Sequence, residues 1–203
     1  MDQIKSAPKA TGILLFLLLL NILNMVDRTL ITSFGSAIIK DLNLSDSQFG
    51  LLTGPIFVFF YSIMGLFMGA LADRVHRPRL IAAGLLLWSA LTAVSGMAKN
   101  FVQIGVARLF IGVGESAMTP SAISMISDLF PKARRGTATG IYYLGVPLGA
   151  GGSFIVAGIL GPMIGWRNCF FLLGGVGVVL ALGLLFLKDP KRGAMEDKED
   201  SMA

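Results

Sequence analysis

Long apolar runs that carry almost no charge dominate this chain, and they limit what it can fold into. A bilayer crossing needs roughly 20 mostly apolar residues, and six runs reach that length: 12–34, 48–71, 80–98, 101–129, 137–160 and 167–187. Backbone polar groups find no water in the bilayer core, so spans of this kind fold as helices. The sequence therefore predicts an all-α membrane protein with six transmembrane helices.

The composition excludes several classes of function. Charged residues make up 14% of the chain, against about 25% in soluble domains. The net charge of +5 does not indicate a nucleic-acid partner, because the basic residues lie between the apolar runs, where membrane topology explains them. The runs contain no Ser/His pair, His-rich cluster or paired-aspartate signature, so we expect no enzyme, metal site or cofactor.

The basic residues also predict an orientation. Twelve fall on one side of the predicted membrane and three on the other, Lys40, Lys99 and Arg167. The twelve are Lys5, Lys9, Arg74, Arg77, Arg79, Lys132, Arg134, Arg135, Lys188, Lys191, Arg192 and Lys198. Cytoplasmic loops are enriched in Lys and Arg, so both termini should be cytoplasmic. A plasma membrane or a bacterial inner membrane is the expected location.

Three segments follow from this pattern. Residues 1–11 form a cytoplasmic N-terminal segment, 12–187 the six-helix bundle, and 188–203 a polar cytoplasmic tail or the start of a linker between two halves. The first run is too long for a signal peptide and contains Asp27 and Arg28, so we expect it to be retained. The tail, with charges in a row at 196–200, should be solvated and flexible.

Two prolines and two glycine pairs mark positions inside the runs. Pro120 and Pro147 each remove a backbone hydrogen bond and should bend their helices; the bends could be structural only or could serve movement. The pairs Gly65–Gly69 and Gly145–Gly149 have the G-x-x-x-G spacing that allows close helix approach. We expect both pairs to serve ordinary helix packing.

Ionisable residues inside the runs are the main candidates for a functional site, because charge at membrane depth is costly. Asp27 and Arg28 lie in the first run, and Arg108 and Glu115 lie seven residues apart on one face of the fourth. Polar or small residues on the same faces are Asn21, Asn24, Gly112 and Thr119. Two polar stripes on different helices predict a shared wet cavity.

This cavity has two interpretations. Burial disfavours a charged carboxylate and a nearby arginine favours it, so Asp27 or Glu115 could exchange a proton as the cavity opens to each side. Arg28 or Arg108 could hold the carboxylate ionised, or could bind an anionic headgroup in its place. Alternatively, these residues form buried ion pairs that only fix helix packing. We favour function for Glu115, whereas Arg108 could equally be a structural anchor.

The loop between the second and third runs is a tight basic turn. It holds Gly69, Asp73, Arg74 and Arg77, and we expect Asp73 near the start of the next helix, where the helix dipole favours a negative charge. His76, the single histidine of the chain, is expected to be solvated or to pack in the loop.

Taken together, these motifs resemble the major facilitator superfamily. Gly69, Asp73, Arg74 and Arg77 match its G-x-x-x-D-R-x-G-R loop, although His76 and Pro78 depart from that pattern. Further partial matches are Arg108-x-x-x-Gly112-x-Gly114 in the fourth run, Gly145-Val146-Pro147-Leu148-Gly149 in the fifth and Gly165-Trp166-Arg167 before the sixth. The resemblance implies transport by alternating access, with the loop acting in conformational gating.

A narrower resemblance is to the Spinster branch, whose members are linked with lysolipid or sphingolipid export. It is carried by Asp27-Arg28, by 73–77, by Gly112–Ser116, by Asp128-Leu129-Phe130 and by 145–149. The resemblance implies proton coupling through Asp27 and Glu115, with Arg28 and Arg108 taking part, and an amphipathic substrate. An Asp-Arg pair in the first span is also similar to the anion:cation symporters, so an organic anion is the alternative substrate.

The family that the chain resembles has twelve spans in two halves with the substrate between them. Three alternatives stay open for a chain with six predicted spans: a fragment of a longer transporter, a half that pairs with a second copy, or a non-transporting half that assembles with another membrane protein. The expected partners are membrane lipid, protons, a small amphipathic or anionic substrate and a second six-helix half.

Overall fold

The computed structural model describes residues 2–195, with side chains from residue 9, and every regular element in that range is helical. The elements are α1 (Asp2–Ser33), α2 (Gly35–Leu42), α3 (Asp46–Thr53), α4 (Pro55–Ala72), α5 (Arg77–Ser95), α6 (Phe101–Glu115), α7 (Met118–Leu129), α8 (Lys132–Tyr143), α9 (Gly145–Ile155), the π-helix η1 (Val156–Leu160) and α10 (Gly161–Leu184). The prediction of an all-α membrane protein is confirmed.

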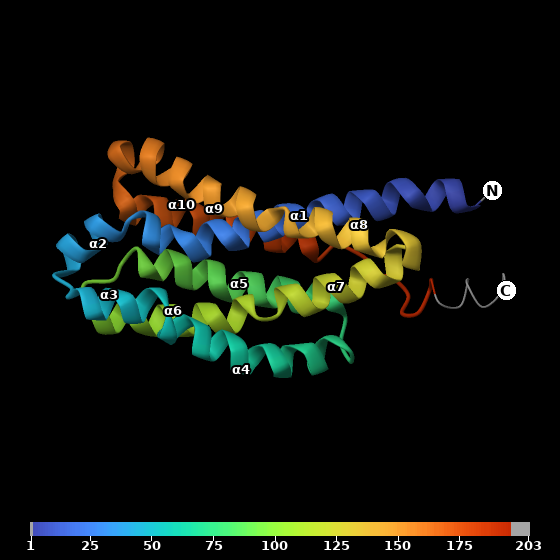
Figure 1. Ribbon diagram of the computed structural model, residues 1–203, viewed down its shortest axis with the longest axis horizontal. Coiled ribbons are helices and arrows are strands. Elements are labelled where there is room, and N and C mark those ends of the chain that lie inside the picture. Colours follow the sequence, from blue (N-terminus) through green and yellow to red (C-terminus); the bar gives the residue numbers. More distant parts are fainter. Residues whose placement is uncertain (1, 196–203) are drawn as a thin grey trace.

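The number of spans depends on how the last helical stretch is counted. The described residues contain five continuous candidate spans: Lys9–Ser33, Asp46–Ala72, Arg77–Ser95, Phe101–Leu129 and Lys132–Leu184. The last has 53 residues and would measure about 80 Å at 1.5 Å per residue, far more than one bilayer. Gly165, with a φ of 79°, interrupts it, and Figure 1 shows α10 returning alongside α9. Six helices result when these two legs are counted separately.

Prolines accompany most of the interruptions inside the spans. The fourth span is broken at Ser116–Ala117, between α6 and α7, and Pro120 cannot donate to the carbonyl of Ser116 four residues earlier. The fifth is broken at Leu144, three residues before Pro147. The second is broken at Gly54, directly before a proline that opens α4; the sequence analysis did not anticipate this break.

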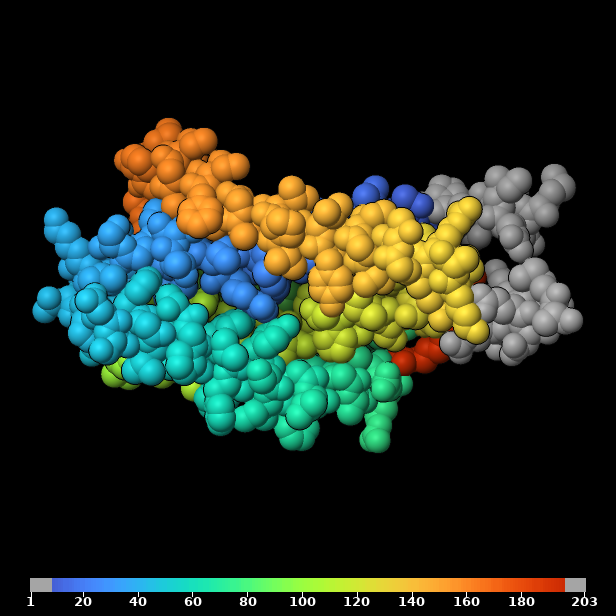
Figure 2. Space-filling view, viewed as in Figure 1, coloured from blue at the N-terminus to red at the C-terminus, as the bar shows by residue number. Residues whose placement is uncertain are grey.

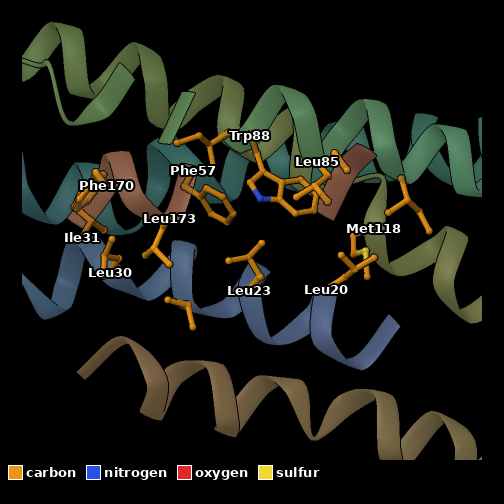
Figure 3. Packing of buried hydrophobic residues seen from close by; sticks show 14 of the residues in the cluster. Leu20, Leu23, Leu30, Ile31, Phe57, Leu85, Trp88, Met118, Phe170 and Leu173 are labelled. Atoms are coloured by element: carbon orange, nitrogen blue, oxygen red, sulfur yellow. The ribbon is translucent and has the colours of Figure 1, made fainter. Parts of the chain in front are cut away.

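One apolar cluster joins the helices. It includes the fully buried Leu20, Leu30 and Trp88, together with Phe57 and Phe170, from four different helices. Figure 3 shows these side chains meeting between α1 and α5. The bundle is therefore held by packing around α1 and α5, and α1 also carries two of the candidate site residues, Asp27 and Arg28.

Glycines set how closely the helices approach. A Cβ on Gly84 of α5 would lie 2.5 Å from the carbonyl oxygen of Gly114 of α6, and one on Gly149 would lie 2.5 Å from the carbonyl oxygen of Ile22 of α1. Gly145 and Gly149 therefore serve the close packing that the sequence predicts. Gly65 and Gly69 do not, because no described atom lies within 4 Å of a Cβ placed there.

The outer surface is apolar along α4. Phe59, Leu66 and Phe67 are 61%, 79% and 62% exposed, which is unfavourable in water and favourable against lipid or another helix. Figure 2 shows α4 and the α8–α9 pair on this face, with α1 visible between them. The start of α1 and the end of the described chain lie at one end of the bundle, with α2 and α3 at the other (Figure 1).

Candidate functional site

Asp27, Arg28, Arg108 and Glu115, here called the charge cluster, lie together between α1 and α6. Arg28 donates two hydrogen bonds to one oxygen of Glu115, from Nε at 2.9 Å and from Nη2 at 2.8 Å. The Glu115 side chain is fully buried, whereas that of Arg28 is 25% exposed. The ion pair therefore joins a residue sealed in the bundle to one that reaches its surface.

Aromatic rings of α4 cover both arginines of the cluster. The Arg28 guanidinium lies 4.8 Å from the Phe57 ring centre and 4.5 Å from that of Tyr61. Arg108, 2% exposed, lies 5.0 Å from the same Phe57 ring and donates from Nη2 to the backbone carbonyl of Arg28 at 3.3 Å. Cation–π contacts of this kind stabilise guanidinium groups in desolvated surroundings. The structure thus places Arg108 in the middle of α6 and within the cluster.

Asp27 has a different environment from Glu115. Its side chain is buried, and Oδ2 accepts a hydrogen bond of 3.2 Å from the indole Nε1 of Trp88. Its direct donor among the described residues is therefore a neutral N–H and not an arginine. Trp88 has no distinctive signal in the sequence, because a tryptophan in an apolar run looks like any other core residue.

Several buried polar atoms near the cluster lack a hydrogen-bond partner among the described residues: Asn24 Nδ2, Asp27 Oδ1, Arg108 Nε, Glu115 Oε1 and the Tyr142 hydroxyl. Thr119, half-buried at the start of α7, lies close to that hydroxyl. Buried polar groups in proteins are usually satisfied. The region therefore has hydrogen-bonding capacity for a proton, water or a polar ligand.

A second group of polar contacts surrounds Arg77, the first residue of α5. We call this group the Arg77 centre. Arg77 is 0% exposed. Its Nε donates to Asp189 Oδ1 at 2.8 Å and its backbone N–H to Asp189 Oδ2 at 3.0 Å. Nη1 donates to Asp128 and, at 2.9 Å, to Ser124, and Nη2 donates to the Pro190 carbonyl at 2.6 Å. Four hydrogen bonds from the side chain and one from the backbone thus join three parts of the chain.

The other residues of the basic loop are placed differently from Arg77. Asp73 and Arg74 are exposed. Asp73 caps the C-terminus of α4, with its N–H bonded to the carbonyl of Gly69 at 3.3 Å, so the prediction that it lies near the start of the next helix is wrong. α5 begins at Arg77, and the half-buried His76 is its N-cap residue without a side-chain cap.

The segment after α10 packs against this loop. Arg192 donates from Nη2 to the carbonyls of Ala72 and Val75, at 2.8 and 2.7 Å, and the N–H of Gly193 donates to Asp128 at 2.9 Å. The prediction of a solvated, flexible tail is therefore wrong for its first residues, which have specific partners. The charged run 196–200 lies outside the described residues.

The far end of the bundle is closed by Arg167. It donates to Asp41 Oδ2 at 2.8 Å and to the carbonyls of Gly96 and Ala98 at 2.9 and 2.6 Å, and Trp166 Nε1 donates to the same carboxylate at 3.1 Å. An open cavity of about 660 Å³ lies beside them. Nothing in the described chain gathers three His, Cys, Asp or Glu residues that could hold a metal ion.

The chain is similar in sequence to a family of known membrane transport proteins. The family model of the Major Facilitator Superfamily matches residues 17–201. An MFS-type efflux pump of Mycolicibacterium smegmatis is 33% identical over 81% of this chain and 38% of its own length. Protein spinster homolog 1 of Xenopus laevis is 31% identical over 96% of this chain and 38% of its own length.

A solved structure is similar in fold as well as in sequence. The crystal structure of a bacterial homolog to the human lysosomal transporter Spinster, inward-facing and unoccupied, aligns with a TM-score of 0.81 and 35% identity. The alignment covers 92% of this chain and 44% of that one. The chain thus spans less than half the length of the relatives it matches.

Proposed function

The chain belongs to the major facilitator superfamily, and from this membership we propose that it forms one half of a proton-coupled secondary active transporter. In this family type two six-helix halves enclose a site that opens alternately to each side of the membrane. The substrate we propose is an amphipathic, lipid-like molecule, with an organic anion as the alternative. The protein is an integral membrane protein.

The Arg28–Glu115 ion pair is the observation that supports this proposal most. Glu115 is sealed and Arg28 is partly exposed, so the two ends of the pair can meet different partners. A proton added to Glu115 removes the charge that holds Arg28. The freed guanidinium can then bind the anionic group of a substrate, and departure of the proton restores the ion pair. Substrate and proton are thereby coupled through one side chain.

Asp27 and Arg108 complete the proposed coupling site. Asp27 is a second buried carboxyl, with an indole N–H as its donor, and Arg108 is a buried arginine that donates to the backbone of Arg28. Asn24 and Thr119 would supply polar contacts for the substrate or for water. The balance of two acids and two bases lets the site take up one proton without leaving a large net charge in the bundle.

The surroundings of Arg28 support an amphipathic substrate. Phe57 and Tyr61 lie against its guanidinium, and the exposed side chains farther along α4 are apolar. A charged head next to an apolar wall matches a lipid with an anionic headgroup. A small organic anion would need the guanidinium but not the wall, so the two substrate classes predict different effects of altering α4.

The Arg77 centre is the proposed gating element. It ties the loop after α4, the end of α7 and the segment after α10, so movement between these parts requires its contacts to break. We also propose that both termini face the cytoplasm of a plasma or bacterial inner membrane, since the basic residues gather at that end. The apolar face of α4 would then meet lipid or the second six-helix half.

Transport in proteoliposomes tests the proposal. The test substrate is a lysophospholipid with an anionic headgroup, supplied on one side of the vesicle membrane. A pH gradient across that membrane should drive its accumulation on the other side. Glu115→Gln should abolish the dependence on the gradient, because the side chain no longer takes up or releases a proton. A small carboxylate tested in parallel distinguishes the alternative substrate class.

Asp41→Asn is the matched control, since Asp41 also pairs with an arginine but at the far end of the bundle. It should keep the wild-type response to the gradient. Gradient-driven accumulation that persists in Glu115→Gln would contradict the coupling assignment. Failure of both substrates to move in the wild-type transporter, with both six-helix halves present, would contradict the proposed substrate classes.

A further inference from the structure

Trp88 is a fully buried residue of α5 whose indole N–H contacts Asp27 of the charge cluster. Its side chain is 0% exposed, and Nε1 lies 3.2 Å from Asp27 Oδ2. Figure 3 shows Trp88 beside Phe57 and Leu85, with its ring nitrogen on the side of α1. A buried indole N–H needs an acceptor, and here the acceptor is an ionisable group rather than a backbone carbonyl.

The crossing of α5 and α6 explains why the ring lies there. Gly84 and Gly114 let the two backbones touch: a Cβ on Gly114 would lie 2.8 Å from the Gly84 carbonyl oxygen and 3.1 Å from the backbone nitrogen of Trp88. Trp88 is one turn beyond Gly84, and Glu115 follows Gly114 directly. The same contact therefore brings together the segments of α5 and α6 that carry the indole and the second acid of the cluster. These two side chains bond to Asp27 and Arg28 of α1.

We propose that Trp88 is a positioning residue for Asp27: its N–H holds Oδ2, so that the carboxyl keeps one orientation and Oδ1 takes up the proton. This inference rests on the proposed coupling function. Oδ1 has no partner among the described residues. The step adds one proton from water to Oδ1 and later returns it, and no bond to Trp88 has to break.

A neutral donor suits this task better than a cation. The indole N–H can donate to the oxygen of a carboxylate and, more weakly, to the carbonyl oxygen of a carboxylic acid. The guanidinium of Arg28, in contrast, binds Glu115 strongly only while that group is charged. Trp88 therefore orients Asp27 in both protonation states, whereas Arg28 favours a single state of Glu115.

The charged groups that act on Asp27 are Glu115 and Arg108 of α6, with Arg28 adjacent on its own helix. The titratable hydroxyls nearest to Arg28 are those of Tyr61 on α4 and Tyr142 on α8. Trp88→Phe leaves all of these in place and keeps an aromatic ring, but it removes the N–H together with the rest of the five-membered ring. The pH profile, rather than stability, is therefore the readout that reports the hydrogen bond.

The first test is the pH profile of transport by the whole protein in proteoliposomes. Trp88→Phe should move the half-maximal pH upward by about one unit, because the carboxylate loses a donor that favours its charged form. Trp166→Phe is the matched control, since Trp166 also donates to an aspartate but at the far end, and it should leave the profile in place. A merely structural role would lower the amount or thermal stability of the protein without moving the profile.

The second test needs no transport. The sequence has two tryptophans, so Trp166→Phe leaves Trp88 as its single indole. Its fluorescence emission should titrate with pH as Asp27 changes charge, and the added Asp27→Asn substitution should remove that titration. This measurement tests the contact between Trp88 and Asp27 even if the Trp88→Phe variant does not fold.

The outcomes separate the two proposals. An unchanged profile in Trp88→Phe, or an emission titration that survives Asp27→Asn, would overturn the role of Trp88 alone. If Asp27→Asn itself kept the wild-type pH profile, the assignment of Asp27 to the proposed coupling site would be contradicted. An emission titration lost with Asp27 and a profile moved by Trp88→Phe would support the inference.

Discussion

The side chain of Arg77 is fully buried and donates to four polar partners, Asp189, Ser124, Asp128 and the Pro190 carbonyl. Its planar guanidinium reaches two carboxylates, a hydroxyl and a carbonyl at once, which a lysine cannot do. Asp128 and Asp189 are 13% and 17% exposed, so neither is well compensated by water once the arginine is gone. The residue therefore combines a structural role with its proposed part in gating.

Arg77→Ala should destabilise the protein by about 3 kcal/mol, because removing one partner leaves two largely buried carboxylates unpaired. Arg77→Lys should recover only part of this loss, since it restores the charge but not the forked geometry. Thermal unfolding of the purified protein in detergent measures both. Arg79→Ala, an exposed neighbour in the same turn, is the control and should have little effect; an equal loss in this control would contradict the argument.

At the residue scale, sequence reasoning located the ionisable groups but not their pairing. Asp27, Arg28, Arg108 and Glu115 could be identified because charge is rare in apolar runs. The bond from Arg28 to Glu115 joins residues 87 positions apart, and only the arrangement of the helices in the bundle decides it. Trp88 could not be found, because its partner depends on which way an indole points. Asp189 was assigned to a solvated tail because a polar sequence does not reveal a buried arginine nearby.

At the element scale, the contact of α5 with α6 depends on two glycines. Gly84 and Gly114 lie backbone to backbone, with no side chain between them. Helix association in membranes relies on close packing of this kind, since lipid is as apolar as the side chains it would replace. This contact also places the backbone of Trp88 against the end of α6, next to Glu115.

Gly84→Ala should cost about 1–3 kcal/mol, because the new methyl group would lie 2.5 Å from the Gly114 carbonyl oxygen and the helices would have to separate. Gly140→Ala on α8 is the matched control. No described atom lies within 4 Å of its added Cβ, and alanine is the better helix former by up to about 1 kcal/mol. We expect Gly84→Ala to lower the unfolding temperature and Gly140→Ala to raise it. A similar decrease in both variants would indicate a general effect of glycine replacement and would contradict the argument.

The helix interruptions show what sequence patterns could and could not predict about elements. Pro120 and Pro147 mark two breaks, since a missing N–H has a definite effect four residues earlier. The break at Gly54 was not predicted, because a glycine followed by a proline at position 55 was hidden inside a long apolar run. The turn at Gly165 was taken as the approach to a separate helix, whereas helical structure continues to both sides of it.

At the scale of the whole molecule, the end of the described chain closes the end of the bundle at which α1 begins. Arg192 holds two carbonyls of the loop after α4, and Gly193 reaches Asp128 at the end of α7. Elements far apart in sequence are thereby joined outside the apolar core. The twelve-to-three distribution of basic residues predicted that these loops lie on the same side of the membrane. It did not predict that the segment after α10 would bind the other loops.

Arg192→Ala should loosen this closure without unfolding the bundle. The amide of Gly193 should then exchange its hydrogen with solvent faster, by about tenfold if the two lost bonds contribute about 1.4 kcal/mol to the local structure. Hydrogen-exchange mass spectrometry of the segment measures the change. Lys188→Ala, an exposed residue of the same segment, should leave the exchange rate as it is; equal rates in Arg192→Ala and the wild type would show that the segment is held by other contacts.

The turn at Gly165 also bears on how the chain enters a membrane. The residues between η1 and Trp166 are Gly161, Pro162, Met163, Ile164 and Gly165, and none of them is charged. A connection this short and apolar presents little polar material to carry across the hydrocarbon layer. We therefore expect the last two legs to insert during biosynthesis as one helical hairpin, so that this part of the protein reaches its final topology in a single event.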